Sequence, residues 1–349
     1  MALIFADSFA HEATAAGALP GKWSSIITNM NTIQVGRSDA QMFDTTFSPC
    51  LLAAGNNGGV MARTLGASYA TLIVGAWFRT GNISNAGVIF ALVDTITSHV
   101  DVRYTAAGLL TVTRNGAVLA TSANAIAINT PYHIELRATI HDSTGAYEVR
   151  VNGSSVGWIP AATGKDTQNG GNASANTIWV CSRGNNDVYS TNHRYAHVTV
   201  CDTSGAVAND FLGPVVIPPR LPIAAGSNTD WAGNYLSNYL NVSETLTDGD
   251  GTFNQTATAT DKDSFVMAAT PSGTVHAVQA SAQVRQDAGS GHTVRLFLRI
   301  SGTNYYGSAQ VVAAVYQIIR EVWTLNPATS AQWVTADLAS IEAGYELVS

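Results

Sequence analysis

Acidic residues that could cut a glycan are few and widely spaced in this chain. Enzymes that hydrolyse glycosidic bonds use two carboxyl groups, one to protonate the leaving oxygen and one to attack or to activate water. Alternate residues of a strand point to one face, so a Glu-x-Asp-x-Glu run would bring such groups together. The sequence has no such run, and Glu135 and Glu148 each stand alone on the polar face of a strand. We therefore expect both to be solvated and expect no enzyme activity.

Acidic pairs and histidines give no strong metal-site pattern either. The run Asp248-Gly-Asp250-Gly251 resembles the start of a calcium loop, but the later ligands and the closing Glu are missing. We expect a tight turn there, with a calcium ion shared with Asp261 or Asp263 as the alternative. His193 and His197 are four residues apart, which suits a helix face, whereas their region has the pattern of a strand. We expect no cofactor, and calcium is the one metal left open.

Aromatic side chains in loops are the candidates for sugar binding, because a pyranose ring stacks well on an aromatic face. Trp158 lies just past a hairpin, and Tyr189 lies in the polar loop 182–192. These two are the preferred ligand-binding candidates, and Tyr305 and Tyr306 are further ones. The alternative is that these rings pack in the core or between subunits.

The three cysteines are Cys50, Cys181 and Cys201, an odd number without CxxC spacing. We expect buried free thiols, because free cysteine behaves as a small apolar residue. A disulfide between Cys181 and Cys201 is the alternative if their strands are neighbours.

The elements that must position these residues are strands. Between Thr130 and Trp158, apolar and polar residues alternate in two runs, and Asn152-Gly153 is a strong hairpin signal. Asn115-Gly116 predicts a second hairpin of the same kind. About a dozen strand-like runs follow each other at short spacing, Trp23 is expected in the core, and no long helix is indicated. This pattern is typical of a β-sandwich or barrel.

A proline-rich segment separates two parts of the chain. Pro214, Pro218, Pro219 and Pro222 fall within nine residues, and proline removes a backbone donor and restricts the preceding residue. We therefore predict a first domain over 1–205, a semi-rigid linker over 206–222 and a second domain over 223–349. The alternative is an edge crossing inside one domain.

The second part also has the pattern of strands, with a few ambiguous places. A helix over 309–319 is an alternative to a strand over 311–323. A short helix is expected near 333–346, capped by Thr335 and ended by Gly344. The expected strands are Asp261–Ala269, Val275–Arg285, Thr293–Ile300, Asn304–Gly307 and Val311–Trp323.

The charge of the chain argues against several partners. The net charge is −7 with no basic run, so we expect no nucleic acid and no anionic membrane as partner. No apolar run reaches the roughly 18 residues of a membrane helix, and the start of the sequence lacks a signal-peptide pattern. We expect synthesis in the cytoplasm without secretion. Only 12% of residues are charged, which fits either packing against neighbouring subunits or a β-rich composition.

Several motifs resemble those of known phage proteins. Three resemble the concanavalin A-like, LamG-type jelly roll: Tyr132-His-Ile-Glu135, the Asp142-x-x-Gly145 turn and Val149-Arg-Val-Asn-Gly153. Others are similar to a subgroup of that fold carried by tailed bacteriophages: Arg194-Tyr195, Val200-Cys201-Asp202 and Asn209-Asp210-Phe211-Leu212-Gly213, then Trp231, Asp263-Ser264-Phe265 and Trp333 in the second part. The subgroup has an acidic pair after Arg-Tyr where this chain has Ala196-His197, so a calcium site there is in doubt.

The resemblance implies two β-sandwich domains, an N-terminal concanavalin A-like jelly roll and a smaller C-terminal sandwich. It also implies a non-enzymatic structural protein on the virion surface, in a tail, fibre or baseplate, that contacts host glycan. The implied partners are other virion subunits and further copies of the chain, with a trimer expected. The alternatives are a capsid decoration protein without a ligand and an enzyme acting on polysaccharide.

Overall fold

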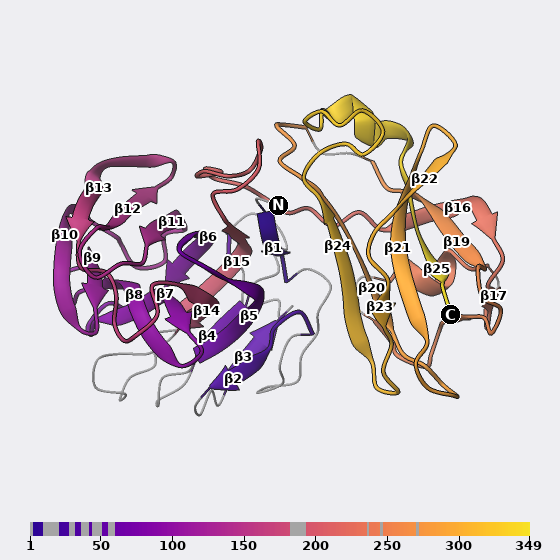
Figure 1. The fold of residues 1–349 in the computed structure, drawn as a ribbon, viewed down its shortest axis with the longest axis horizontal. Helices are drawn as coiled ribbons and strands as arrows, with labels where there is room; N and C mark the ends of the chain where they lie inside the picture. The colour runs from indigo at the N-terminus through magenta and orange to yellow at the C-terminus, as the bar shows by residue number, and fades with distance from the viewer. Residues whose placement is uncertain are drawn as a thin grey trace. The chain divides into compact units, whose positions relative to one another are not determined.

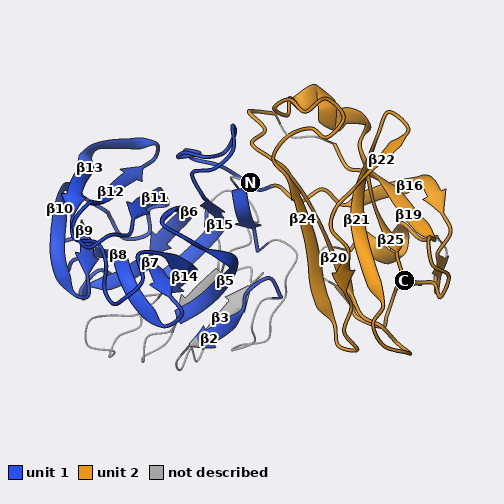
Figure 2. Cartoon of the chain, in the orientation of Figure 1, with its two compact units in different colours: residues 1–217 blue, residues 218–349 orange. Residues whose placement is uncertain are grey.

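The structure, a computed structural model, confirms an all-β chain (Figure 1). It divides into two compact units, unit 1 over residues 1–217 and unit 2 over residues 218–349 (Figure 2). This division lies inside the proline-rich segment. No helix of the described part is long and apolar enough to cross a membrane. The residues that the structure describes are 3–9, 21–27, 32–35, 42–43, 51–54, 60–181, 193–235, 237–244, 247–269 and 272–349.

Unit 1 is a sandwich of two antiparallel sheets, here called sheet A and sheet B. Sheet A runs in the order β13 (Ser154–Lys165), β12 (Gly145–Val151), β11 (Tyr132–Thr139), β6 (Thr71–Thr80), β15 (His193–Cys201), β4 (Leu51–Ala54) and β3 (Thr32–Val35), with β1 (Leu3–Asp7) also paired to β15. Sheet B runs in the order β10 (Ala117–Ala125), β9 (Leu109–Arg114), β8 (Thr97–Tyr104), β7 (Gly87–Asp94), β14 (Ala175–Cys181), β5 (Val60–Tyr69) and β2 (Ser25–Ile27).

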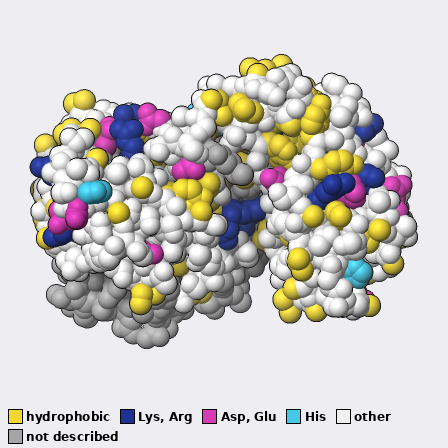
Figure 3. Space-filling view, viewed as in Figure 1, with side chains coloured by type: hydrophobic (Ala, Val, Ile, Leu, Met, Phe, Trp, Pro, Cys, Tyr) yellow, Lys and Arg dark blue, Asp and Glu magenta, His cyan; other side chains and the backbone are white. Residues whose placement is uncertain are grey.

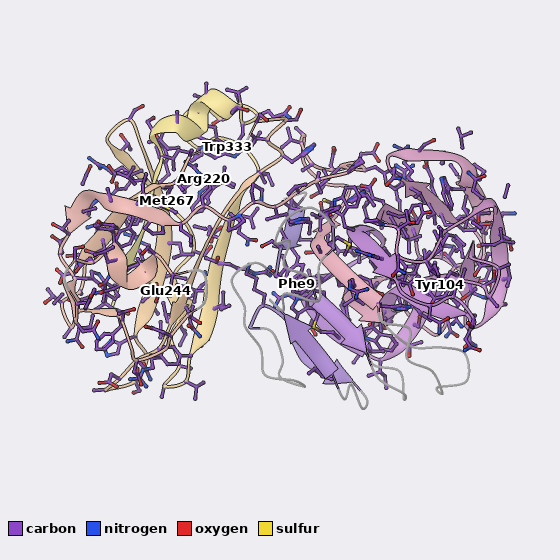
Figure 4. All side chains as sticks on the ribbon, turned by 180° about the vertical axis from the view of Figure 1, so that it is seen from behind. Phe9, Tyr104, Arg220, Glu244, Met267 and Trp333 are labelled. Atoms are coloured by element: carbon purple, nitrogen blue, oxygen red, sulfur yellow. The ribbon has the colours of Figure 1, made fainter. Side chains whose placement is uncertain are left out.

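The core of unit 1 lies between the two sheets. The alternation in β11 directs Ile134 and Leu136 inward, and both are fully buried. From sheet B, Tyr104 enters the same core (Figure 4). Trp23 is buried in it as expected. Large apolar side chains of this kind each contribute roughly 1.5–3 kcal/mol when removed from water, so the alternation decides which face of each sheet is inside.

Both predicted Asn-Gly hairpins are confirmed. Asn115 and Gly116 join β9 to β10, and Asn152 and Gly153 join β12 to β13, all four with positive φ. A two-residue turn of this kind needs left-handed backbone at both positions, which asparagine and glycine adopt at low cost. The second turn closes the hairpin of β12, which carries Glu148 and Arg150 of the site described below.

Unit 2 is built on a six-stranded antiparallel sheet, sheet C. One face of this sheet is covered by two apolar clusters, and a separate pair of strands, named below, also packs its side chains into them. Trp333 is buried in one of these clusters (Figure 4). Sheet C runs in the order β16 (Pro222–Thr229), β19 (Lys262–Met267), β25 (Glu342–Leu347), β21 (Thr293–Ile300) and β22 (Thr303–Tyr306), with β23 (Gln310–Val311) also on β21. The remaining elements are the pair β20 (Val278–Val284) and β24 (Gln317–Trp323), the pair β17 (Ala232–Gly233) and β18 (Asn254–Gln255), and the 3-10 helices η1 (Leu240–Val242) and η2 (Thr335–Ser340).

Two expectations for the end of unit 2 are wrong. The helical alternative over 309–319 fails, because that stretch holds β23 and the start of β24, with irregular backbone over 312–316 that also interrupts the expected strand Val311–Trp323. The short helix is present as η2, but it ends at Ser340, and Gly344 lies inside β25. Thr335 does not cap it, since its hydroxyl donates to the Gly273 carbonyl.

The disulfide alternative is also wrong. Cys201 is a free, buried thiol in β15 of sheet A, whereas Cys181 ends β14 of sheet B. Burial raises the pKa of the Cys201 thiol, and the nearby Glu135 and Asp202 add to this shift. Cys201 is therefore an inert core residue, and Cys50 lies outside the described residues.

Candidate functional site

The outer face of sheet A carries a row of polar side chains across three neighbouring strands. Glu135 on β11 and Thr199 on β15 lie on either side of Gly75 on β6. A Cβ atom on Gly75 would lie 3.0 Å from Glu135 Cγ and 3.2 Å from Thr199 Oγ1. The missing side chain of Gly75 therefore gives these two residues their room. His133 and Trp77 form the next row, paired across the same two strands.

This face is covered by residues 206–217, which we call the strap. The backbone N–H groups of Leu212 and Gly213 donate to Glu135 Oε1 at 2.9 and 3.1 Å. The Trp77 indole N–H donates to the Val215 carbonyl at 2.9 Å. The Ile217 N–H donates to His197 Nδ1 at 3.2 Å. Side chains of the sheet thus form hydrogen bonds with backbone groups along the length of the strap.

A second set of contacts holds the middle of the strap. The guanidinium carbons of Arg137 and Arg150 lie 4.9 and 4.1 Å from the centroid of the Phe211 ring. Arg137 also pairs with Asp210 at 2.9 Å and with Glu148 at 3.0 Å, and Arg150 pairs with Glu148 at 2.7 Å. Glu148 therefore keeps two arginines in place over one aromatic ring.

The expectation that Glu135 and Glu148 are solvated is wrong. Both are buried, with 1% and 5% of their surface exposed. Glu135 lies beneath the strap, and Glu148 is enclosed by its two arginines. The alternation of β11 and β12 correctly places both residues on the polar face. It cannot show that a segment more than fifty residues later in the chain covers that face.

Burial also shifts the titration of this cluster. The pKa values of His133 and His197 are lowered to about 4, mainly by burial, with the neighbouring His197 adding to the effect at His133. Burial raises the pKa of Glu135, and the two strap N–H groups oppose that shift. Both imidazoles are therefore neutral at pH 7.

The cluster contains groups that could transfer a proton, but they are enclosed. His133 Nδ1 lies 3.8 Å from Glu135 Oε2, and neither His133 ring nitrogen has a hydrogen-bond partner among the residues that the structure describes. His133 is fully buried, with the Trp77 ring 5.6 Å away in an edge-to-face arrangement. A glycan cannot reach the pair while the strap is in place. What the arrangement can do as it stands is fix the strap to the sheet.

The predicted sugar-binding residues are not brought together in the described part of the chain. Trp158 is half-buried on β13 and packs edge-to-face on Tyr132, with ring centroids 6.2 Å apart. Tyr305 is half-buried against the core of unit 2. Tyr306 is 38% exposed, with the Arg295 guanidinium carbon 3.8 Å from its ring centroid. Tyr189 lies outside the described residues.

The acidic residues proposed for calcium have other partners. Asp248 accepts the Thr252 N–H inside a turn, and Asp250 pairs with Arg285 at 3.0 Å. Asp263 is fully buried on β19, accepts the Trp231 N–H, and has its pKa raised to about 6 by burial. Within the described ranges no three acidic, histidine or cysteine side chains gather in a way that could hold a metal ion.

Sequence reasoning missed the strap and its anchors Arg137 and Arg150. One signal for them was present, because Asp210-Phe211-Leu212-Gly213 belongs to a motif on which the phage resemblance rests. The prolines that follow this motif predict a linker there. In the structure it is bound to unit 1.

Comparisons with known proteins give only distant likenesses. No family model and no curated protein matches the chain. Among solved structures, Trypanosoma rangeli sialidase in complex with sialic acid is similar over 57% of this chain, at 12% identity and a TM-score of 0.36. Alginate lyase AlgAT5 from polysaccharide lyase family 7 is similar over 43% of this chain and 77% of its own, at 12% identity and a TM-score of 0.31. The chain spans 30% of that sialidase and 16% of another. TM-scores this low say nothing about activity.

Proposed function

We propose that this chain is a non-enzymatic structural protein displayed on the surface of a tailed-phage virion, where it contacts host glycan. The observation that carries the non-enzymatic part is the closed face of sheet A. Its two glutamates are bound to backbone N–H groups of the strap and to arginines. Carboxyl groups held in this way support structure and are not free to act on a substrate.

The surface of unit 2 supports packing against other subunits. Nine of the fourteen exposed large apolar side chains among the described residues belong to unit 2, and Figure 3 shows apolar side chains at several places on its visible face. Val311 and Val315 are 66% and 71% exposed. With few charges to keep copies apart, such a surface suits an assembled protein.

The placement on the particle rests on the resemblance of the sequence motifs, and immunogold labelling of intact virions tests it. We expect label on the tail, fibre or baseplate. Label spread over the head would favour the decoration protein instead, and the absence of label from every virion would overturn the phage proposal.

The glycan contact and the absence of activity are tested on purified protein. We expect binding on an array of bacterial surface glycans that weakens in Trp158→Ala, whose ring is partly exposed at the edge of sheet A. No binding to any glycan would overturn this part alone. Release of reducing ends from a host polysaccharide by the wild type, abolished in Glu135→Gln, would overturn the non-enzymatic assignment.

A further inference from the structure

The strand β20 is an open edge in unit 2. Among the described residues it pairs only with β24, through seven consecutive residue pairs from Val278↔Trp323 to Val284↔Gln317 without a bulge. In an antiparallel pair, alternate residues direct both backbone groups toward the same neighbour. The backbone N–H and C=O groups of β20 that face away from β24 have no backbone hydrogen-bond partner in the described part of the chain.

The other side of the pair is partly occupied. The Gln310 side-chain amide donates to the Arg320 backbone carbonyl of β24 at 2.9 Å, and the side-chain carboxylate of Glu321 on the same strand accepts the Ser308 N–H at 2.9 Å. The edge of β24 is therefore partly covered, and β20 is the more open edge of this two-stranded sheet. Figure 1 shows the two strands side by side in unit 2.

β20 lacks the features that usually keep sheet edges apart. Natural edge strands are protected by charges, prolines, bulges or short length. β20 is seven residues long with no charge and no proline. By contrast, the edge strand β16 begins at Pro222, and its pairing with β19 shifts register twice. The open edge at β20 is therefore suited to pairing with another strand.

The sequence of β20 identifies that strand, because it is the same in both directions: Val278-Gln-Ala-Ser-Ala-Gln-Val284. Two copies that run antiparallel with Ser281 facing Ser281 place valine opposite valine, glutamine opposite glutamine and alanine opposite alanine. A twofold interface requires this kind of self-complementary patch. No charge is set against a like charge in that register.

Burial along the strand agrees with an edge that is incompletely covered. Ala280, Ala282 and Val284 pack on the core of unit 2 but are only half-buried, while Ser281 and Gln283 on the other face are exposed. Pairing of two such strands would extend both cores across the joint.

We propose that a second copy of this chain binds at β20, antiparallel about a twofold axis at Ser281, to form a four-stranded sheet β24-β20-β20-β24. The inference depends on β20 alone, so it stands whether or not the chain is a virion protein. It favours a dimer over the trimer that the resemblance implies.

Disulfide trapping of the full chain tests the register. Ser281→Cys places two thiols opposite each other on the axis, and we expect a covalent dimer under mild oxidation. Gln283→Cys is equally exposed, but each copy would face residue 279, about 13 Å along the strand from its equivalent, and we expect no dimer. Equal trapping of both variants, or trapping of neither, would overturn the proposal, as would a trimer of the wild type in native mass spectrometry.

A charge variant tests the pairing without oxidation. Ser281→Glu lies opposite Arg320 within its own chain, so the fold is retained, while two carboxylates meet on the axis. We expect self-association, measured by sedimentation, to weaken about tenfold, because like charges set against each other at an interface oppose binding. Ala225→Glu on the edge strand β16 is the matched control and should leave it unchanged. Weakening by the control and not by Ser281→Glu would place the contact at another edge and overturn the proposal.

Discussion

At the scale of single residues, the buried histidines make unit 1 sensitive to acid. His133 and His197 have pKa values of about 4 in the folded chain, against about 6.5 when unfolded. The folded state binds fewer protons between these values, so its stability is complete above pH 6.5 and falls as the pH is lowered toward 4. Between pH 6.5 and pH 5, each histidine lowers the free energy of unfolding by about 2 kcal/mol.

The variant His133→Leu isolates one of these contributions. The His133 ring nitrogens have no hydrogen-bond partner in the described part of the chain, so the apolar replacement should change the free energy of unfolding at pH 7 by less than about 1 kcal/mol. The substitution should reduce the loss of unfolding free energy between pH 6.5 and pH 5 by about half. Urea unfolding of both proteins at the two pH values measures this. A variant as acid-sensitive as the wild type would contradict it, even though the raised pKa of Glu135 acts in the opposite direction.

Substitutions of Glu135 test whether attachment of the strap requires a hydrogen-bond acceptor or a negative charge at this position. Glu135→Ala leaves the N–H groups of Leu212 and Gly213 without their acceptor, and we expect a loss of about 2 kcal/mol in the free energy of unfolding at pH 7. Glu135→Gln keeps an acceptor oxygen and removes a buried charge, so it should stay within about 1 kcal/mol of the wild type. Equal losses in the two variants would show that the charge itself is required.

At the scale of elements, the strap is the part of unit 1 whose attachment can be measured directly. Phe211→Ala removes the ring that lies against Arg137 and Arg150, an interaction of about 1–2 kcal/mol for two cation–π contacts. Cleavage within 206–217 by thermolysin should become about tenfold faster, because proteolysis follows the population of the open state.

The matched control lies in the same segment. Val216 is 57% exposed, so Val216→Ala should leave the cleavage rate unchanged. If the wild type is cleaved in the strap as fast as Phe211→Ala, the segment behaves as a free linker and the contacts do not hold it in solution.

The elements differ in how far the sequence predicts them. The turns at Asn115-Gly116 and Asn152-Gly153 are predicted because left-handed backbone favours these residue types, which is a local property. The inward positions Ile134 and Leu136 follow from alternation, which is also local. The position of the strap over Glu135 depends on hydrogen bonds from the backbone N–H groups of residues 212–213 to the Glu135 side chain on β11. No local sequence pattern encodes such a long-range contact. The β25 strand was missed for a related reason, since Gly344 has the local signature of a helix end.

At the scale of the whole molecule, the proline-rich segment indicates two units. It does not indicate to which unit its own residues belong. Residues 206–217 group with unit 1 and residues from 218 with unit 2. Pro218, Pro219 and Pro222 therefore mark the junction, whereas Pro214 lies inside the strap. Composition can show that a segment is irregular. It cannot show whether that segment is free or bound to a neighbouring sheet.

The two units have separate cores, and two glycines allow each core to be disturbed alone. A Cβ atom on Gly344 would collide with the Asp263 carbonyl and lie 2.5 Å from Phe297 Cζ in unit 2. One on Gly145 would collide with Thr167 and lie 2.6 Å from the Lys165 carbonyl in unit 1. Overpacking of this kind costs about 2–3 kcal/mol. Each alanine variant should therefore lower the midpoint of one thermal transition by about 4–12 °C.

Differential scanning calorimetry of the full chain measures both transitions. We expect Gly344→Ala to shift one of them and Gly145→Ala to shift the other, because the buried cluster around Leu136 contains only residues of unit 1 and that around Leu298 only residues of unit 2. Gly66→Ala, where a Cβ atom would have no neighbour within 4 Å, is the control and should shift neither. A single transition that moves with both variants would mean that the units unfold as one cooperative body.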